Sequence, residues 1–244
     1  MFKNYELEIL YKDDYLVCIN KPSGLLVHKS MIDRHEIYYA MKMLRDQLDG
    51  KWVYPIHRLD KPTSGVLLFA LDSHTAKLMN EQFKNHTIQK TYIAVARGYV
   101  PESGFIDHAL KEKLDKISDK DASKYKEAQE AKTEYKLLQT VEIDASVGKY
   151  DKTRYSLVEL KPQTGRKHQL RRHMKHINHH LLGDTKYGRG EHNKFVRERY
   201  GMHRLLLHAI SLEVEHPYSH EKLFFYASFD DVFKKIFKEF HWSL

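Results

Sequence analysis

The sequence places a carboxylate on a tight turn that runs directly into an apolar segment. Residues 57–60 read His-Arg-Leu-Asp, residues 61–65 read Lys-Pro-Thr-Ser-Gly, and the apolar run Val66–Ala70 follows. Proline presets φ and glycine tolerates positive φ, so these residues favour a turn of defined geometry. The apolar run predicts a buried strand. We therefore expect Asp60, beside Arg58, on a fixed backbone at the mouth of a sheet.

Length and composition favour one soluble domain with an anionic partner. A chain of 244 residues can bury a full core, so a single catalytic domain over residues 1–244 is expected. Lys and Arg number 41 against 33 Asp and Glu, and the net charge of +8 favours a polyanion. The single Cys18 permits no intrachain disulfide. Without a signal-peptide core or an apolar run of ~20 residues, a cytoplasmic protein is expected.

Apolar patterning predicts an α+β fold. Helices are expected over residues 73–85, 168–177 and 230–240, where apolar side chains recur at helical spacing. Strands and helices do not alternate strictly, which favours a mixed, mainly antiparallel sheet with flanking helices over a doubly wound parallel sheet. The segments rich in β-branched and aromatic residues predict strands at residues 7–11, 15–21, 66–71, 92–99, 155–160, 205–214 and 223–227.

Charge is concentrated in two segments. Lys161–Arg204 holds twelve Lys and Arg against three Asp and Glu, a surplus that exceeds the net charge of the whole chain. Such a concentration is typical of a surface that binds phosphates, with affinity that falls steeply as salt rises. Lys111–Glu130 mixes both signs and has few large apolar groups, which predicts a solvated loop or surface helix, or else an arm that clamps RNA.

Two further segments carry groups suited to nucleotide chemistry. Residues 89–98 read Gln-Lys-Thr-Tyr-Ile-Ala-Val-Ala-Arg-Gly, and residues 160–173 read Leu-Lys-Pro-Gln-Thr-Gly-Arg-Lys-His-Gln-Leu-Arg-Arg-His. With the His-Arg-Leu-Asp turn and Asn20–Gly24, they resemble in order and spacing the motifs of RNA pseudouridine synthases, in the broad bacterial group that includes the large-subunit rRNA enzymes. The resemblance covers about residues 7 to 228. It implies the α+β pseudouridine synthase fold and an isomerisation that needs no cofactor.

The resemblance implies roles in a reaction that detaches uracil from C1′ of its ribose and rejoins it through C5. Asp60 is the catalytic carboxylate, which either attacks C1′ or takes the 2′ proton to give a glycal. Arg166 favours its ionised form, because burial alone would raise the pKa of a carboxyl group. The uridine must leave its helix; Tyr92 stacks on the base and assists proton removal from C5. Leu170 forms an apolar wall, and Arg58 fills the vacated place in the RNA stack or holds the backbone.

Other residues are expected to support binding. His57 is expected to hold the turn by hydrogen bonds rather than act as a base. The histidines at 173, 176, 179 and 180 lack a Cys pair, an H-E-x-x-H motif or an adjacent carboxylate, so no metal site is expected and they add to the basic surface. Phosphate contacts are expected from Lys90, Lys167, Arg171, Arg172 and Lys175.

Departures from the rRNA-type members point to a subgroup. Residues 26–34 read Leu-Val-His-Lys-Ser-Met-Ile-Asp-Arg where those enzymes commonly carry His-Pro-Gly, and no separate RNA-binding domain is expected ahead of Tyr5. Both features resemble the subgroup that modifies uridine 65 of tRNA. His180 stands where the family often has proline, which leaves the conformation of that loop open. No obligate protein partner is evident, so a monomer acting on tRNA is expected.

Three alternatives remain at this point. Within the class, the substrate could be rRNA. From other classes, the chain could be a noncatalytic RNA-binding protein on the same fold, or a His-dependent ribonuclease. The presence of Asp60, Tyr92 and Arg166 argues against the noncatalytic alternative, and a ribonuclease would shorten its substrate, whereas isomerisation leaves its mass unchanged.

Overall fold

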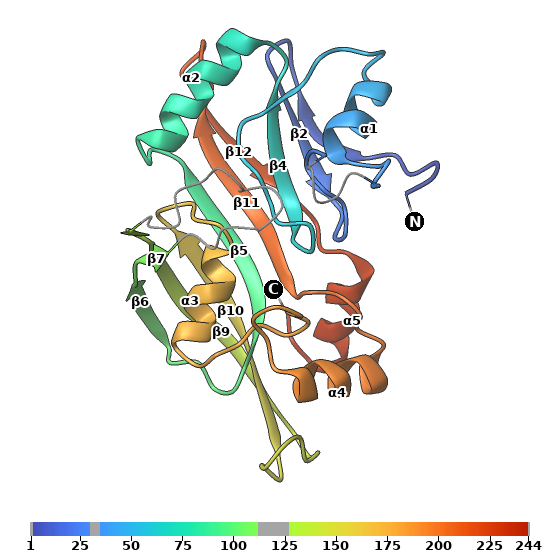
Figure 1. Ribbon diagram of the computed structural model, residues 1–244, viewed down its shortest axis with the longest axis vertical. Helices are drawn as coiled ribbons and strands as arrows, with labels where there is room; N and C mark the ends of the chain where they lie inside the picture. Colours follow the sequence, from blue (N-terminus) through green and yellow to red (C-terminus); the bar gives the residue numbers. More distant parts are fainter. Residues whose placement is uncertain (1, 30–34, 112–126, 244) are drawn as a thin grey trace. The chain divides into compact units, whose positions relative to one another are not determined.

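The computed structural model describes residues 2–29, 35–111 and 127–243, which divide into two compact units (Figure 1). Unit 1 comprises Met1–Gln89, Ala109–Gln129 and Ser211–Ala227. Unit 2 comprises Lys90–His108, Glu130–Ile210 and Ser228–Leu244. Strand β11, Leu207–Glu215, contributes residues 207–210 to unit 2 and residues 211–215 to unit 1. Whether the whole chain acts as one catalytic domain stays a prediction.

Unit 1 is built on antiparallel strands. Strand β2 pairs with β1 on one side and with β4 on the other, and residues 211–215 of β11 pair with β12. A separate two-stranded sheet joins β7 and β8. The strands are β1 Glu8–Lys12, β2 Leu16–Lys21, β3 Tyr54–Pro55, β4 Ser64–Ala70, β7 Leu110–Lys111, β8 Ala128–Gln129 and β12 Lys222–Tyr226. The helices are α1 Ala40–Gln47 and α2 Ser73–Lys84.

The core of unit 1 follows from two sequence patterns. Alternate residues of β2 and β4, together with Ala76 and Met79 of α2, form one buried apolar cluster. Helix α2 begins where the sequence predicts, because Oδ1 of Asp72 accepts a hydrogen bond of 2.8 Å from the backbone N–H of Thr75. Cys18 lies in this cluster, where burial raises the pKa of its thiol, as expected for a structural cysteine. Trp52 is 52% exposed outside it, with the guanidinium of Arg45 3.8 Å from its ring centre.

Unit 2 has an antiparallel sheet with helices on both faces. Strand β10 pairs antiparallel with β5 and with β9, and β9 pairs antiparallel with β6. The strands are β5 Gln89–Arg97, β6 Ser103–Asp107, β9 Lys132–Ile143 and β10 Thr153–Pro162. The helices are α3 Gln169–His176, α4 Gly190–Tyr200 and α5 Asp231–Glu239. These pairings confirm the predicted α+β class with a mainly antiparallel sheet.

Alternation along β10 divides the core of unit 2 into two clusters. Leu157 faces a cluster that contains Phe233 of α5 and Val196 of α4, whereas Leu160 faces a second cluster that contains Leu170 of α3. The predicted apolar stripe on α5 is confirmed. The first cluster also encloses Trp242, which is 7% exposed and donates its indole N–H to the carbonyl of Thr140.

Several elements were not predicted from the sequence. They are α1, α4, the short strands β3, β6, β7 and β8, and the long strand β9. Of the charged segment Lys111–Glu130, residues 112–126 lie outside the described residues. No helix within the described ranges is both long and apolar enough to cross a membrane.

A buried ion pair joins α3 to the loop that follows it. Nε and Nη2 of Arg171 lie 2.8 Å from Oδ2 and Oδ1 of Asp184, and the two side chains are 6% and 1% exposed. Burial alone would raise the pKa of Asp184, but the hydrogen bonds and charge of Arg171, with the backbone N–H groups of Tyr187 and Lys186, lower it. Asp184 is therefore held ionised inside unit 2.

Replacing Asp184 tests how much this pair contributes. Asp184→Asn should lower the free energy of unfolding by about 3–5 kcal/mol, because it leaves the buried guanidinium of Arg171 without a counter-charge. Urea unfolding followed by circular dichroism measures the loss. Asp46→Asn, which breaks the exposed pair between Lys42 and Asp46, is the matched control and should leave the midpoint unchanged. Equal midpoints for both variants would contradict this role.

The pKa of Asp184 is lower in the folded chain than in the unfolded chain. The ionised carboxylate therefore makes its full contribution to the free energy of unfolding when the pH is above the ordinary Asp pKa of about 3.9. That contribution should decline as the pH falls through the lower folded pKa. Acid titration of the wild-type protein and of Asp184→Asn should therefore show stabilities that converge at low pH.

Candidate active site

The turn that carries Asp60 is fixed by backbone contacts within unit 1. The N–H of Thr63 donates to the carbonyl of Asp60 at 3.0 Å, which closes the turn. The carbonyl of Lys61 accepts from the N–H of Gly24 at 2.8 Å, and the carbonyl of Pro62 accepts from the hydroxyl of Ser23 at 2.8 Å. The Asn20–Gly24 segment thus holds the Asp60 turn through main-chain groups.

Lys21 is the centre of this arrangement, which sequence reasoning did not identify. Its side chain is fully buried, and Nζ donates to the carbonyls of Leu25 at 2.7 Å, Pro22 at 2.9 Å and Lys61 at 3.3 Å. Three acceptors satisfy the three N–H donors of an ammonium group. A buried ammonium therefore ties the early loop to the turn beside Asp60.

The flanking motif residues have distinct surroundings. Nε2 of His57 accepts a hydrogen bond of 3.1 Å from the backbone N–H of Leu68, and its ring stacks on Phe83. These contacts fit the structural role expected for His57. Arg58 is exposed and Asp60 is half-buried. Burial first, and then the charge of Arg58, lowers the pKa of His28.

Unit 2 brings two of the other expected site residues together. Tyr92 on β5 is half-buried and packs against the cluster that contains Leu170, the second residue of α3. Tyr92 is also the register partner of Leu160 on β10. An aromatic ring and an aliphatic side chain therefore share the face of the sheet that α3 covers.

Arg166 lies in the short connection between β10 and α3. Its Nε donates to the carbonyl of Glu130 at 2.9 Å, and its backbone N–H donates to Oε1 of Gln169 at 3.0 Å. Gln169 is 4% exposed, and its Nε2 donates to the carbonyl of Lys132 at 2.9 Å and lies 3.0 Å from Oγ1 of Thr133. One buried amide thus fastens the Arg166 loop to strand β9.

Hydroxyl and imidazole groups complete this network. The hydroxyl of Thr164 donates to Oε1 of Gln169 at 2.8 Å and accepts from the backbone N–H of Lys132 at 3.0 Å. Nδ1 of His173 lies 2.9 Å from Oγ1 of Thr133. Buried polar groups that are all satisfied specify one arrangement, because each lost bond leaves a partner unpaired. The network therefore fixes the backbone at Arg166, in the connection that leads from β10 to α3.

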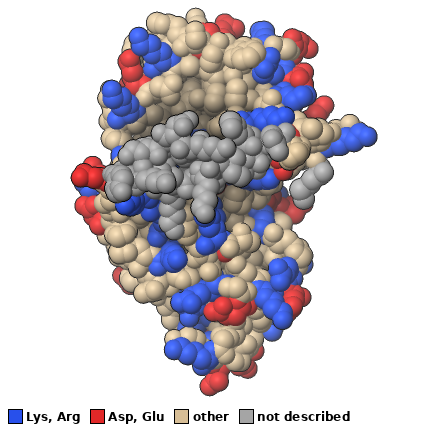
Figure 2. Space-filling view, in the orientation of Figure 1, with Lys and Arg blue, Asp and Glu red and all other residues tan. Residues whose placement is uncertain are grey.

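The expected phosphate-binding residues fall into different environments. Lys167 and Lys175 are exposed, and Arg172 is half-buried. Lys90 is half-buried, and burial lowers its pKa to about 8. Arg171 requires a correction: its guanidinium is buried against Asp184, so we remove it from the expected RNA contacts. Figure 2 shows Lys and Arg side chains over the part of unit 2 that carries α3 and α4.

The clustered histidines serve separate structural contacts. His173 bonds to Thr133 and to the carbonyl of His108, His176 stacks on the ring of His108, and Nδ1 of His179 lies 2.9 Å from the carbonyl of Arg97. Among the described residues, no group of three or more His, Cys, Asp or Glu is placed to hold a metal ion.

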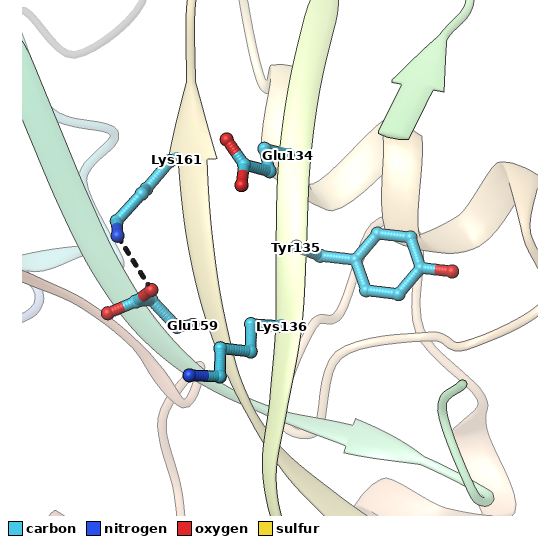
Figure 3. A pocket seen from close by; sticks show the side chains of 5 residues that line it. All are labelled: Glu134, Tyr135, Lys136, Glu159 and Lys161. Carbon is cyan, nitrogen blue, oxygen red and sulfur yellow. Dashed lines mark ion pairs between the residues drawn. The ribbon is translucent and has the colours of Figure 1, made fainter. Parts of the chain in front are cut away.

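A shallow pocket lies on β9 and β10 (Figure 3). Lys161 and Glu159 form an ion pair of 2.9 Å on its wall, whereas the ring of Tyr135 points to the other side of the strand. Two lysines and two glutamates line the pocket, so their charges offset one another. The lining residues are Glu134, Tyr135, Lys136, Glu159 and Lys161. Nothing in this pocket favours a charged ligand.

Comparisons with known proteins agree with the motifs. The family profile described as RNA pseudouridylate synthase matches residues 15–176, a range that includes Asp60, Tyr92, Arg166 and Leu170. Among solved structures, human RNA pseudouridylate synthase domain containing 4 is 27% identical with a TM-score of 0.72, covering 97% of this chain and 94% of that chain. Human RNA pseudouridylate synthase domain containing 1 is 26% identical with a TM-score of 0.68, covering 92% and 84%.

Curated relatives match over nearly the whole length. The tRNA pseudouridine synthase C of Vibrio parahaemolyticus is 54% identical over 98% of this chain and 96% of its own length. The tRNA pseudouridine synthase C of Haemophilus ducreyi is also 54% identical, with 97% of each chain covered. The chain therefore belongs to the RNA pseudouridylate synthase family, and it is an RNA-modifying isomerase.

Gln169 gives a test of the network that holds Arg166. Gln169→Ala should lower the free energy of unfolding by about 1–3 kcal/mol, because it leaves buried N–H and C=O groups without partners. Gln163→Ala, an exposed glutamine in the same connection, is the matched control and should have little effect. Urea unfolding measures both, and equal stability of the two variants would contradict the network.

Proposed function

We propose that the protein isomerises a uridine of tRNA, at position 65, to pseudouridine. The observation that carries this proposal is the 54% identity, over almost the full length of both chains, to relatives named tRNA pseudouridine synthase C. The sequence features around residues 26–34 support the same subgroup. We further propose that the chain acts as a monomer in the cytoplasm, as one catalytic domain.

Asp60 is proposed to start the reaction. Its ionised carboxylate either attacks C1′ and displaces uracil, or removes the 2′ proton as the C1′–N1 bond breaks to give a glycal. The freed uracil then turns and bonds to C1′ through C5, which displaces the Asp60 carboxylate from its ester or, in the glycal alternative, is accompanied by return of the proton to C2′. N1 takes up a proton, and C5 releases one. The contacts that hold the backbone of residues 60–63 support this role, because a fixed carboxylate loses little freedom on reaction.

Arg166, Tyr92 and Leu170 are proposed to act around that carboxylate and the base. The guanidinium of Arg166 supplies the positive charge that keeps Asp60 ionised, and its planar fork suits a carboxylate. Tyr92 stacks on the flipped uracil and its phenol assists proton removal from C5, while Leu170 lines the apolar side of the base. The shared cluster of Tyr92 and Leu170 supports this division of roles.

The remaining cations are proposed to bind the RNA. Arg58 fills the place that the flipped uridine leaves, or holds the backbone beside it, and its exposure supports either role. Phosphate contacts are proposed for Lys90, Lys167, Arg172 and Lys175.

Mapping pseudouridines in cells tests the substrate. Total RNA from cells with and without the gene is treated with a pseudouridine-selective reagent and analysed by mass spectrometry. We expect one site, at position 65 of tRNA, to disappear without the gene. A lost site in rRNA would replace tRNA by rRNA as the substrate, and shortened RNA after incubation with the purified protein would indicate a ribonuclease.

Substitution of Asp60 tests the catalytic carboxylate. Asp60→Asn should lower conversion of tRNA by at least about 10³-fold, because an amide is neither a carboxylate nucleophile nor a base, while the Kd for tRNA stays close to the wild-type value. Asp49→Asn, an exposed aspartate in the same unit, is the matched control and should retain full activity. Turnover by Asp60→Asn at the wild-type rate would refute the assignment.

Arg166→Lys tests whether the guanidinium fork matters beyond its charge. The variant keeps one positive charge but loses the planar geometry, so kcat should fall by about 10-fold or more while the protein remains folded. Lys234→Arg provides the control, since it makes the reverse exchange at an exposed lysine to which no RNA contact is assigned. Wild-type kcat in Arg166→Lys would remove Arg166 from the active site.

A further inference from the structure

A cationic pocket lies in unit 2 beside the end of α3, and of its lining residues only Lys175 already has a place in the proposed function, as a phosphate contact. It encloses about 280 Å³ and is lined by Lys175, Asn178, His180, Lys186, Tyr187, Gly188 and Arg189. Three of these residues are cationic, and none of them is acidic. The nearby carboxylate of Asp184 is buried and paired with Arg171. A hydrogen bond from its own backbone N–H first, and then nearby charges that include Arg189, lower the pKa of Glu191, an acidic residue just outside the lining. The pocket therefore has an excess of positive charge that is only partly offset, unlike the pocket on β9 and β10.

His180 gives this pocket an unusual buried group. Its side chain is 94% buried, being 6% exposed, and Nδ1 has no hydrogen-bond partner among the described residues. Burial first, and then the charges of Arg189, Arg97 and Lys175, lowers its pKa. Since an enclosed N–H without an acceptor is costly, the neutral ring carries its proton on Nε2. That N–H is left to donate to a ligand.

The loop that forms the pocket wall is fixed before any ligand binds. Oδ1 of Asp184 accepts from the backbone N–H groups of Lys186 at 2.9 Å and Tyr187 at 3.0 Å, and the carbonyl of Asp184 accepts from Gly188 at 2.9 Å. A Cβ atom at Gly188 would lie 2.2 Å from that carbonyl oxygen, so only glycine permits this approach. The cations thus stand on a preorganised backbone, which reduces the entropy lost on binding.

We propose that this cationic pocket binds a backbone phosphate of the RNA substrate. A phosphate is a compact anion whose several acceptor oxygens match two ammonium groups, a guanidinium fork and an imidazole N–H. The proposal rests on the proposed RNA-modifying function and names a contact made by residues to which no part in the chemistry is assigned. His180, where the family often has proline, becomes a phosphate-binding residue of this chain.

Removing two of the cations tests the pocket. Lys186→Ala/Arg189→Ala should raise the Kd for tRNA by about 10–100-fold at low salt and reduce the slope of log K against log salt by about one, as expected for one lost phosphate contact. The matched control is Lys194→Ala/Arg197→Ala, which removes the same residue types from exposed positions of α4. Filter binding over a KCl series measures both, and thermal unfolding checks that each variant folds.

Comparing the two variants shows whether the affinity for tRNA depends on the pocket or on surface charge in general. The proposal expects the control to keep a slope close to the wild-type slope, and kcat at saturating tRNA to stay unchanged in the pocket variant. Equal loss of affinity in both variants, or wild-type affinity in the pocket variant, would overturn it.

A second measurement does not depend on catalysis. The imidazole resonances of His180, assigned with a His180→Gln variant, are followed by NMR while oligoadenylate or inorganic phosphate is added. We expect oligoadenylate, which has phosphates but no uridine, to shift them saturably. Should the protein convert no uridine and yet show this shift, the proposed function fails while the pocket stands. A shift with inorganic phosphate but none with oligoadenylate would overturn the RNA assignment.

Discussion

The ion pair between Arg171 and Asp184 organises much of unit 2. Arg171 follows Leu170 on α3. The ion pair of Arg171 therefore fixes the orientation of α3 about its axis, and with it the direction of Leu170, the residue expected to form the apolar wall beside the base. Asp184 also accepts from the backbone of the loop that presents Lys186, and its carbonyl accepts from the side-chain amide of Asn193 at 2.9 Å. One buried aspartate, through its carboxylate and its backbone carbonyl, thereby positions a helix, a cationic loop and the start of α4. Its cost in desolvation is offset because every oxygen has a donor.

The residues expected to do chemistry are supported locally, each within its own unit. In unit 1, the ammonium of Lys21 and the Asn20–Gly24 segment hold the turn of Asp60 by its main-chain carbonyls. In unit 2, the amide of Gln169 holds the backbone of Arg166 in the same manner. Both supports act on the backbone rather than on the functional side chain. This arrangement fixes the position of each residue through its main chain.

Local patterns predicted what depends on neighbours in sequence. The turn at Asp60 follows from its proline and glycine, and helices α2 and α5 follow from the helical spacing of their apolar side chains. Strand β9 was missed because charged residues such as Glu134 and Lys136, which disfavour strands, alternate with its buried side chains. Without β9, the partners of Gln169 could not be identified, since they lie 36 and 37 residues away. Arg171 was misassigned for a related reason, because its counter-charge belongs to a loop beyond α3.

The two tryptophans offer a spectroscopic consequence of this architecture. The chain has 2 Trp residues, Trp52 in unit 1 and Trp242 in unit 2. Trp52 is largely open to water beneath Arg45, whereas Trp242 is enclosed among the aromatic rings of α5. An indole shielded from water emits at shorter wavelength than a hydrated one, so the blue edge of the fluorescence reports Trp242 almost alone. The fluorescence of Trp242 can therefore report the opening of unit 2, and the emission of Trp52 serves as the reference.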